Sequence, residues 1–407
     1  MSEQRILAFG YACDPHGGSE PGVGWAWGQM LASIGETWLI TRANNREAIE
    51  AELSLSERDR LHFVYVDLPG WARWWKRGQR GVRLYYLLWQ LAALRRAREL
   101  HKEVTFTLVW HLTLANAWLG SVGGLVGPPL VYGPVGGGIG SPPLRIVTAL
   151  GPRAVLYELT RDVARSAGRY LNPMARLAWM RARVILVQNP ETKTWFPKRH
   201  RDRIVVFPNP ILDLAAPARR TGQPAKTAVF AGRFLPTKGA EIAVRAVAAT
   251  PDWCLLVCGG GIGEGRLRRL VRQLALEERV LVLGPQRRER LFEMLRSADV
   301  LLYPSLREDG GWIVVEALAC GLPVICVDRG GPPVLAGAAG LVVARSGDID
   351  AIAAALGERL AGSALPAPDV LRARAAHFSS ERTCQRLRRL LGATGLVRST
   401  PSEVEIV

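Results

Sequence analysis

The sequence predicts an α/β protein made of two Rossmann-like, doubly wound parallel sheets in tandem. Three observations support this prediction. The chain has 407 residues, which is too long for one ordinary hydrophobic core. Short apolar runs alternate with helix-like stretches in both halves, as in repeated βα units. A stretch rich in Pro, Ala and Gly, residues 208–224, separates the two halves and has the composition of a linker.

Seven apolar runs in the first half predict parallel strands. Strands that helices cover on both faces are nearly continuously apolar, and these runs have that pattern. We assign residues 1–210 to a first domain. Its expected strands are residues 6–9, 38–41, 63–66, 107–110, 130–132, 184–187 and 204–207.

The alternation restarts after the linker, and residues 211–377 form the expected second domain. A final helix, at about 378–392, is expected to return to the first domain, and residues 393–407 are expected to be disordered. Ligands of such folds bind beyond the carboxyl ends of the strands, so we expect a cleft between the domains. The second-domain strands are 228–231, 255–258, 280–283, 300–303, 324–327 and 341–343, with helices near Ala240, Arg266, Glu289, Trp312 and Ile349.

Composition and charge limit the function classes. A hydrophobic content of 48% with 22% charged residues is typical of a globular protein. The formal net charge of +17 indicates an anionic partner, either phosphorylated substrates, a membrane surface or nucleic acid. No nucleic-acid-binding module accompanies the charge, so nucleic acid is the least favoured. The start has no signal-peptide pattern and no apolar run reaches the length of a membrane span, so a cytoplasmic protein is expected.

A metal site is not expected. The six cysteines are scattered and form no short-spaced Cys/His set, so buried free thiols are the better interpretation. Asp348 and Asp350 have an Asp-x-Asp spacing that some enzymes use to bind a metal ion. These two aspartates stand where a helix begins, however, and N-capping explains them better.

Two glutamates eight positions apart, Glu308 and Glu316, identify the chemistry best. Glu308 follows an expected strand, and Gly310 and Gly311 let the backbone turn tightly near a ligand. Glu316 lies about a turn inside the next helix, whose N-terminus attracts anions. Carboxylates accept charge-assisted hydrogen bonds from sugar hydroxyls, so this spacing suits a nucleotide sugar.

The second domain opens with a candidate diphosphate site. Gly232 and Arg233 follow the first strand, and Lys238 precedes Gly239 at the start of a helix. Two cations beside a helix N-terminus would bind a diphosphate and stabilise the charge of a departing nucleoside diphosphate. The alternative is two solvated basic residues in a loop. The downstream glutamates favour the functional interpretation.

The first domain offers weaker signals. Gly17 and Gly18 lie in a glycine-rich loop before Ser19, a candidate N-cap, and let backbone N–H groups approach a phosphate. This loop is neither a dinucleotide fingerprint nor a Walker loop. His111 ends an expected strand and is either a ligand contact or a structural histidine. The loop with Gly136 and Gly137 follows the next strand and is either part of an acceptor site or a flexible turn.

These motifs, in this order, resemble the retaining glycosyltransferases of family 4, which have the GT-B fold. The resemblance covers nearly the whole chain and is most specific between Gly232 and Pro323. It implies a transferase that uses a nucleotide-activated sugar without a metal or other cofactor. One departure concerns the residues after Glu308. Family members often have a small residue and then Phe-Gly there, whereas this chain has Asp309-Gly310-Gly311-Trp312.

The resemblance also implies roles for single residues. Arg233 and Lys238 would hold the diphosphate, Glu316 the donor ribose, and Glu308 the sugar hydroxyls. Backbone groups between Gly310 and Ile313, including those of Gly311 and Trp312, would reach the sugar and phosphates. Gly17 and Gly18 would complete the phosphate site, and His111 would bond the donor sugar.

A basic segment between Arg73 and Arg98 has eight basic residues, no acidic one, and interleaved aromatic residues. Such a segment suits an anionic membrane surface, although a core helix with a solvated cationic rim explains it equally well.

We therefore expect a retaining hexosyltransferase that acts on a hydroxyl acceptor, with lipid-linked and cell-envelope or exopolysaccharide glycans as candidates. It would work in the cytoplasm, with peripheral attachment at the inner face of the membrane as an option. The alternatives are an epimerase or phosphorylase of the same fold, or a non-catalytic basic protein that binds membranes.

Overall fold

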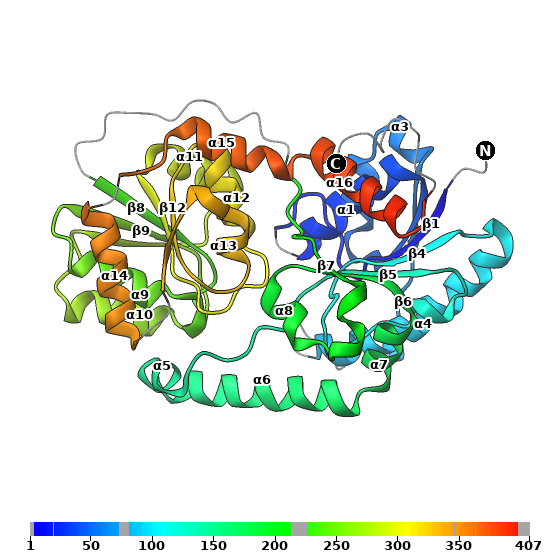
Figure 1. Ribbon diagram of the computed structural model, residues 1–407, viewed down its shortest axis with the longest axis horizontal. Coiled ribbons are helices and arrows are strands. Elements are labelled where there is room, and N and C mark those ends of the chain that lie inside the picture. Colours follow the sequence, from blue (N-terminus) through cyan, green and yellow to red (C-terminus); the bar gives the residue numbers. More distant parts are fainter. Residues whose placement is uncertain are drawn as a thin grey trace. The chain divides into compact units, whose positions relative to one another are not determined.

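The computed structural model describes residues 4–18, 20–72, 81–212, 226–344, 347–362 and 364–397. Contacts divide the chain into two compact units (Figure 1). The first unit contains residues 1–138, 165–211 and 380–407, and the second contains 139–164 and 212–379. Ser19, most of the expected linker and residues 398–407 of the expected disordered tail lie outside the described residues.

The first unit is built on a parallel sheet with the strand order β3-β2-β1-β4-β5-β6-β7. All seven expected strands are present. The chain moves from β1 outward through β2 to β3 and then returns to β4 on the other side of β1, so the order reverses between β1 and β4. The strands are β1 (Arg5–Phe9), β2 (Glu36–Thr41), β3 (Leu61–Tyr65), β4 (Leu108–His111), β5 (Leu130–Val135), β6 (Ala182–Val187) and β7 (Ile204–Val206).

The helices of the first unit pack an aromatic core against this sheet. Trp27, Trp89, Trp110 and Trp179 are completely or almost completely buried. Together with fully buried aliphatic side chains of the sheet, they supply the main apolar area that stabilises the unit. The helices are α1 (Glu20–Ile34), α2 (Arg46–Glu52), α3 (Leu55–Arg58), α4 (Val82–Val104), α7 (Pro173–Arg181), α8 (Pro190–Trp195) and α16 (Ser380–Ala393).

The final helix returns to the first unit, as expected. α16 packs against α1, and the Arg388 guanidinium donates to the carbonyl oxygen of Ser33, at 2.7 Å. Leu387 and Leu391 of α16 are fully buried. The chain therefore crosses from the second unit back to the first before it ends.

The basic segment only partly suits a membrane surface. Residues 73–80 lie outside the described residues. In α4, Tyr85, Tyr86 and Trp89 are fully buried, so these aromatic side chains pack into the protein and do not face solvent. The expected aromatic contribution to membrane binding is therefore wrong for these three residues. Among the described residues, no helix is long and apolar enough to cross a membrane.

The second unit repeats the doubly wound topology, with the parallel strand order β10-β9-β8-β11-β12-β13. Here the order reverses between β8 and β11, whose register pairs Val300 with Ala228 and Leu301 with Val229. All six expected strands are present: β8 (Lys226–Ala231), β9 (Trp253–Cys258), β10 (Val280–Gly284), β11 (Val300–Tyr303), β12 (Val324–Val327) and β13 (Gly340–Val343).

The five helices expected in the second unit are present, and two more follow β12 and α14. A continuous aliphatic core joins them to the sheet, with Phe230, Leu301 and Leu318 among its buried residues. The helices are α9 (Ala240–Ala248), α10 (Glu264–Gln273), α11 (Arg288–Ser297), α12 (Trp312–Ala319), α13 (Gly331–Ala336), α14 (Ile349–Gly362) and α15 (Pro368–Ala375).

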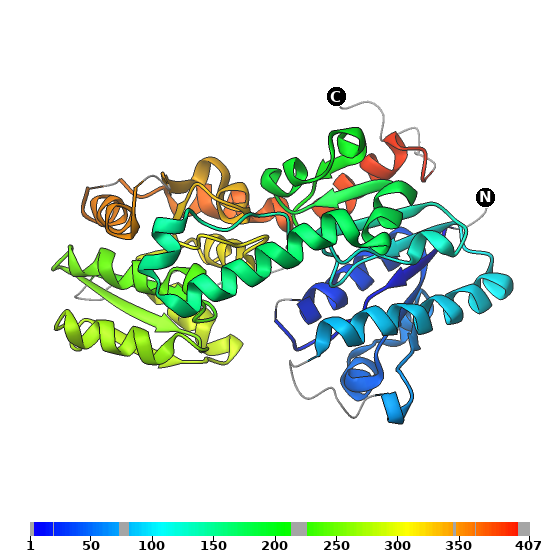
Figure 2. The same ribbon diagram turned by 90° about the horizontal axis from the view of Figure 1, so that it is seen from below.

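One segment belongs to a different unit from the one the sequence predicted. Residues 139–164 were expected in the first domain, but they pack with the second unit. They carry α5 (Leu144–Ala149) and the first part of α6 (Pro152–Leu171), the long helix seen along its length in Figure 2. Ile146, Val147, Leu150 and Ala154 join the core of the second unit, which explains the assignment.

Candidate functional site

The second unit brings its candidate residues together at the point where its strand order reverses. β8 and β11 are neighbours there, and loops after parallel neighbours leave the same edge of the sheet. The loop after β8 carries Arg233 and Lys238, and the loop after β11 carries Glu308. A position beyond the carboxyl ends of two such strands is where open α/β sheets bind ligands.

Lys238 and Glu308 form a direct ion pair. The Lys238 ammonium bonds Oε2 of Glu308, and the hydroxyl of Tyr303 donates to the same oxygen at 2.7 Å. The side chains of Lys238 and Glu308 are only 13% and 19% exposed. Such a pair is screened little by water, so its electrostatic interaction is stronger than that of a surface pair.

Backbone packing holds Lys238 beside Glu308. Leu306 N–H donates to the carbonyl oxygen of Thr237, at 2.9 Å, so the two loops are tied one residue before Lys238. Gly239 has a φ of 85°, and a Cβ there would lie 2.2 Å from the carbonyl oxygen of Pro304. Only glycine permits this conformation and this approach without strain.

The local charges keep Glu308 ionised. Burial alone would raise the pKa of this carboxyl group. The Lys238 ammonium, hydrogen bonds from Lys238 and Tyr303, and the charge of Arg233 oppose burial and hold the pKa below its ordinary value. Tyr303, buried beside a carboxylate, has its pKa raised well above the ordinary value. The site therefore contains a carboxylate anion and two cations at neutral pH, with a phenol that keeps its proton.

The loop that follows Glu308 rests on a second glycine pair. Gly331 N–H donates to the carbonyl oxygen of Glu308, at 2.8 Å. A Cβ on Gly331 would meet the carbonyl oxygen of Gly310 at 2.1 Å, and one on Gly330 would meet that of Glu308 at 2.3 Å. This glycine pair is not among the residues that the sequence predicted for the site. Its signal was the Gly-Gly-Pro sequence that follows an apolar strand after two intervening residues.

The predicted glycine turn opens α12. Gly311, with a φ of 108°, is the N-cap of this helix, and Gly310 is buried. Trp312 and Ile313 form the first turn and are half-buried. The positive end of the helix thus lies beside the loop that carries Glu308, where an anion would be stabilised.

Glu316 lies in the second turn of α12 and pairs with an arginine that the sequence analysis missed. Arg288 Nη1 is 2.9 Å from Glu316 Oε1, with side-chain exposures of 46% and 8%. Burial raises the pKa of Glu316, and the charge and hydrogen bond of Arg288 only partly offset this effect. Arg288 is the first residue of α11, and its guanidinium also lies over the ring of Phe292.

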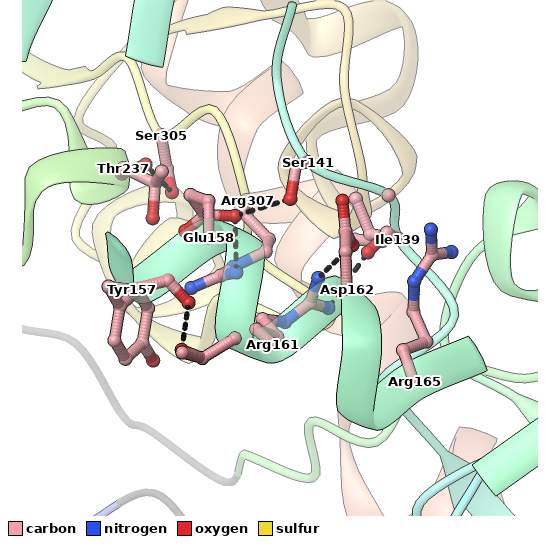
Figure 3. Close-up of polar contacts among 12 residues, drawn as sticks. Ile139, Ser141, Tyr157, Glu158, Arg161, Asp162, Arg165, Thr237, Ser305 and Arg307 are labelled. Carbon is pink, nitrogen blue, oxygen red and sulfur yellow. Dashed lines mark hydrogen bonds and ion pairs between the residues drawn. The ribbon is translucent and has the colours of Figure 1, made fainter. Parts of the chain in front are cut away.

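The segment 139–164 braces the loop after β11 and the turn after β12 that supports it (Figure 3). Glu158 of α6 pairs with Arg307, the residue before Glu308, at 2.8 Å. Ser141 Oγ donates to the same glutamate oxygen, at 2.7 Å. Arg329, the residue before Gly330, donates to the carbonyl oxygens of Gly140 and Ser141, at 2.6 and 3.2 Å. No local sequence pattern indicated these contacts.

The glycine-rich loop 259–263 packs against residues 232–234. Phe234 N–H donates to the carbonyl oxygen of Gly260, at 2.8 Å. A Cβ on Gly259 would lie 1.9 Å from the carbonyl oxygen of Gly232. Close backbone packing therefore explains Gly259. The exposed Arg233 lies between Gly232 and Phe234, the two residues that this loop contacts.

His111 lies in the core of the first unit. Its side chain is fully buried, and it stacks on Phe9. Nε2 bonds the Tyr86 hydroxyl at 2.7 Å, and Nδ1 bonds the Ser121 hydroxyl at 2.8 Å. Burial lowers the pKa of His111 to about 3, so the ring is neutral. A contact with a donor sugar is not supported, because both ring nitrogens already have protein partners. The structural interpretation fits.

The glycines predicted in the first unit have structural environments of two kinds. Gly136 and Gly137 are buried, and Gly136 exchanges backbone hydrogen bonds with Ala115 and Ala117. A Cβ on Gly137 would meet the Asn116 side chain at 2.4 Å, so tight packing explains this glycine. Gly18 is exposed, and nothing lies within 4 Å of the place where a Cβ would stand.

The second unit also carries a family signature. Residues 217–376 match the family of glycosyl transferases group 1. The chain is 39% identical over 148 residues to the D-inositol 3-phosphate glycosyltransferase of Mycolicibacterium smegmatis, covering 33% of this chain and 34% of that protein. It is 41% identical over 143 residues to the corresponding protein of Mycobacterium sp. strain KMS, covering 32% and 33%. The matched part thus spans about a third of each relative.

Solved structures extend the likeness to the whole fold. HepE of Anabaena, in complex with UDP and glucose, aligns with a TM-score of 0.61 at 18% identity, covering 96% of this chain and all of the other. Sucrose-phosphate synthase of Thermosynechococcus elongatus aligns with a TM-score of 0.64 at 21% identity, covering 96% and 98%. The fold is therefore that of the GT-B glycosyltransferases, with two Rossmann-like parallel-sheet domains.

Metal chemistry has no candidate site in the part of the chain that the structure describes. No group of three or more His, Cys, Asp or Glu side chains there could hold a metal ion. Asp348 accepts from the backbone N–H of Ala351 at 2.9 Å, which is the N-capping contact that the sequence predicted. Asp350 pairs instead with Arg245, at 3.0 Å.

Proposed function

We propose that the protein is a metal-independent retaining glycosyltransferase that moves a hexose from a nucleotide diphosphate sugar to a hydroxyl group. The observation that carries this proposal is the cluster of Arg233, Lys238 and Glu308 at the reversal point of the second sheet. The family match over residues 217–376 and the glycosyltransferase names of the curated relatives support the reaction class.

Each member of the cluster has a distinct task in the proposed reaction. Arg233 and Lys238 neutralise the charge that develops on the diphosphate as the bond to the sugar breaks. Glu308 accepts hydrogen bonds from hydroxyls of the donor sugar, because it is ionised and partly accessible. Its pair with Lys238 fixes both side chains before the donor binds, which lowers the entropy lost on binding.

Glu316 is proposed to accept the ribose hydroxyls of the donor. Arg288 occupies one of its oxygens, and the other is left for a ligand. A buried carboxylate with a raised pKa gains most from new hydrogen-bond donors, because they replace lost hydration.

Retention of the anomeric configuration is proposed to follow a front-face route. The leaving phosphate would accept the acceptor's proton, so the protein would need no separate general base. Among the candidate residues, Glu308 is committed to Lys238 and Tyr303, and Glu316 to Arg288. Neither is thus poised as a free base, which is consistent with a phosphate-assisted step.

The test is turnover with nucleotide sugars and hydroxyl acceptors, after a thermal-shift screen of UDP, GDP, ADP and TDP sugars has chosen the donor. NMR of the product should show the donor's anomeric configuration, and activity should survive EDTA. An inverted product or loss of activity in EDTA would contradict the proposal. A control without acceptor separates the alternatives, because an epimerase would alter the donor and a phosphorylase would form a sugar phosphate from inorganic phosphate.

A further inference from the structure

The part of α6 in the second unit exposes three large apolar side chains and buries a charged one, Glu158, while Ala154 packs into the core. Leu156, Leu159 and Val163 are 63%, 60% and 61% exposed. Their spacing of three and four residues places them along one side of the helix. We call these three residues the α6 ridge. An ordinary surface helix has the opposite arrangement, with its apolar stripe against the core.

The inward side of the same helix carries charged side chains that bond the protein (Figure 3). Glu158 is 3% exposed and pairs with Arg307. Arg161 donates to the carbonyl oxygen of Ile139, at 2.8 Å. These contacts fix the rotation of α6, because turning the ridge inward would break a buried ion pair and expose its partners. The ridge is therefore held outward by the structure.

More exposed apolar side chains occur near the ridge in the sequence. Leu144 of α5 is 70% exposed, and in the last turn of α6, within the first unit, Tyr170 and Leu171 are 62% and 79% exposed. Single exposed apolar residues are normal, but a series of them along one helix marks an interaction surface.

Charge indicates which partner covers this surface. The segment 144–181 contains seven arginines and two acidic residues, and Arg145 and Arg153 are exposed. A second copy of this chain would bring the same positive charge to the contact, with a net charge of +17 for each molecule. An anionic bilayer instead offers apolar contact and charge complementarity together.

We propose that the α6 ridge binds an anionic lipid bilayer, with the flanking arginines at the headgroups. The inference deepens the proposed function and rests on it for the acceptor, which would be a membrane-bound hydroxyl compound. Leu159 follows Glu158 directly, and Glu158 pairs with the residue before Glu308. Docking through the ridge would thus hold the donor site of the second unit close to the bilayer surface.

The test is flotation of the full chain with vesicles of phosphatidylcholine alone or mixed with phosphatidylglycerol. The wild-type protein should float with the anionic vesicles and lose this binding as salt is raised. The triple variant Leu156→Gln, Leu159→Gln, Val163→Gln should bind at least tenfold more weakly, because membrane binding scales with buried apolar area. Its Tm should equal that of the wild type, since these positions are exposed.

Two matched variants make the result specific. Leu84→Gln, Leu88→Gln, Leu91→Gln changes the exposed leucines of α4, and Ile262→Gln, Leu274→Gln, Val370→Gln changes exposed residues of the second unit. Both should bind vesicles as the wild type does. Unchanged binding of the α6 triple variant, or loss of binding in the α4 variant alone, would overturn the proposal. So would a wild-type dimer that the α6 changes convert to a monomer without any vesicle binding.

Transfer to a soluble acceptor, measured without vesicles, separates this proposal from the proposed function. The α6 triple variant should keep wild-type turnover in that assay. If the wild type turns over no nucleotide sugar, the proposed function fails. The flotation experiment still tests vesicle binding by the α6 ridge, because it does not depend on turnover.

Discussion

Arg307 Nη1 lies 2.8 Å from Glu158 Oε2, in an ion pair whose side chains are only 9% and 4% exposed. The pair joins α6 to the residue before Glu308, across 149 positions of the sequence. Arg329 makes a second tie, from the turn that supports Glu308 to residues 140 and 141. The segment 139–164 is therefore part of the scaffold of the candidate site.

Removing one member of this pair should destabilise the protein strongly. Glu158→Ala leaves the buried guanidinium of Arg307 without its counter-charge, so we expect a loss of about 3–5 kcal/mol in the free energy of unfolding. Urea unfolding measures this loss. The double variant Glu158→Ala, Arg307→Met should recover part of it, because the uncompensated charge is gone. This account would be contradicted if the double variant lost as much free energy of unfolding as the two single variants together.

Lys238→Met should affect both catalysis and the ionisation of Glu308. Loss of one charge-stabilising donor lowers kcat by about two to three orders of magnitude. The lowered pKa of Glu308 contributes stability that is present above its ordinary value of 4.5 and is lost as the pH falls through the folded-state value. The variant should thus be least stable, relative to wild type, near neutral pH. Unfolding measured from pH 3 to 7 would refute this if the difference grew on acidification.

Glu316→Gln should weaken donor binding without lowering stability at neutral pH. The raised pKa of Glu316 means that the folded state holds more protons than the unfolded state above pH 4.5, so this group's contribution falls as the pH rises. We expect the donor KM to rise about tenfold or more, the scale of a lost charged hydrogen bond. Glu293→Gln, an exposed glutamate of α11, is the control. An unchanged donor KM for Glu316→Gln would remove it from the site.

Two glycines next to the site should respond differently to alanine. Gly239→Ala places a Cβ 2.2 Å from the carbonyl oxygen of Pro304 at a φ of 85°, so the backbone there must shift. We expect a loss of more than about 1 kcal/mol. At Gly232 the nearest atom to a new Cβ is 3.6 Å away and belongs to the Phe230 ring. Gly232→Ala should keep the Tm of the wild type, and equal losses in both variants would disprove the steric argument.

His111→Asn should reduce stability rather than turnover. The pKa of about 3 is below the ordinary value of 6.5, so the unfolded state binds the proton first and stability falls as the pH drops below about 6.5. The variant should lose this pH dependence and keep the wild-type donor KM and kcat at a temperature where it is folded. A large loss of kcat with an unchanged Tm would instead restore the predicted contact with the donor.

The fold could be predicted because its strands are continuous apolar runs. Runs such as residues 300–303 and 324–327 are typical of central strands that are buried on both faces. A helix follows each of them. The order of four residues along the chain also pointed to one site: Arg233 and Glu308 follow strand ends, Lys238 precedes a helix, and Glu316 lies inside the helix that follows Glu308. Lys238 and Glu308 were assigned separate ligands, however, and the structure pairs them.

What the sequence did not reveal depends on contacts between distant residues. Glu158 and Arg307 have no local pattern that marks them as partners, so residues 139–164 were assigned to the wrong domain. The sequence does not distinguish Arg288 from the other arginines of the surface. Its pair with Glu316 depends on how α11 packs in the fold. His111 ends its strand as predicted. The hydrogen bonds of its two ring nitrogens with Tyr86 and Ser121 cannot be inferred from its position in the sequence.

The most direct test of the central claim is calorimetric titration of the wild type, Arg233→Ala and Arg269→Ala with the nucleoside diphosphate of the preferred donor. Arg269 is an exposed arginine of α10 and serves as the matched control. We expect the wild type and Arg269→Ala to bind equally and Arg233→Ala to bind at least tenfold more weakly, as a lost charged contact predicts. Equal binding by all three proteins, or no binding of any nucleoside diphosphate by the wild type, would contradict the account.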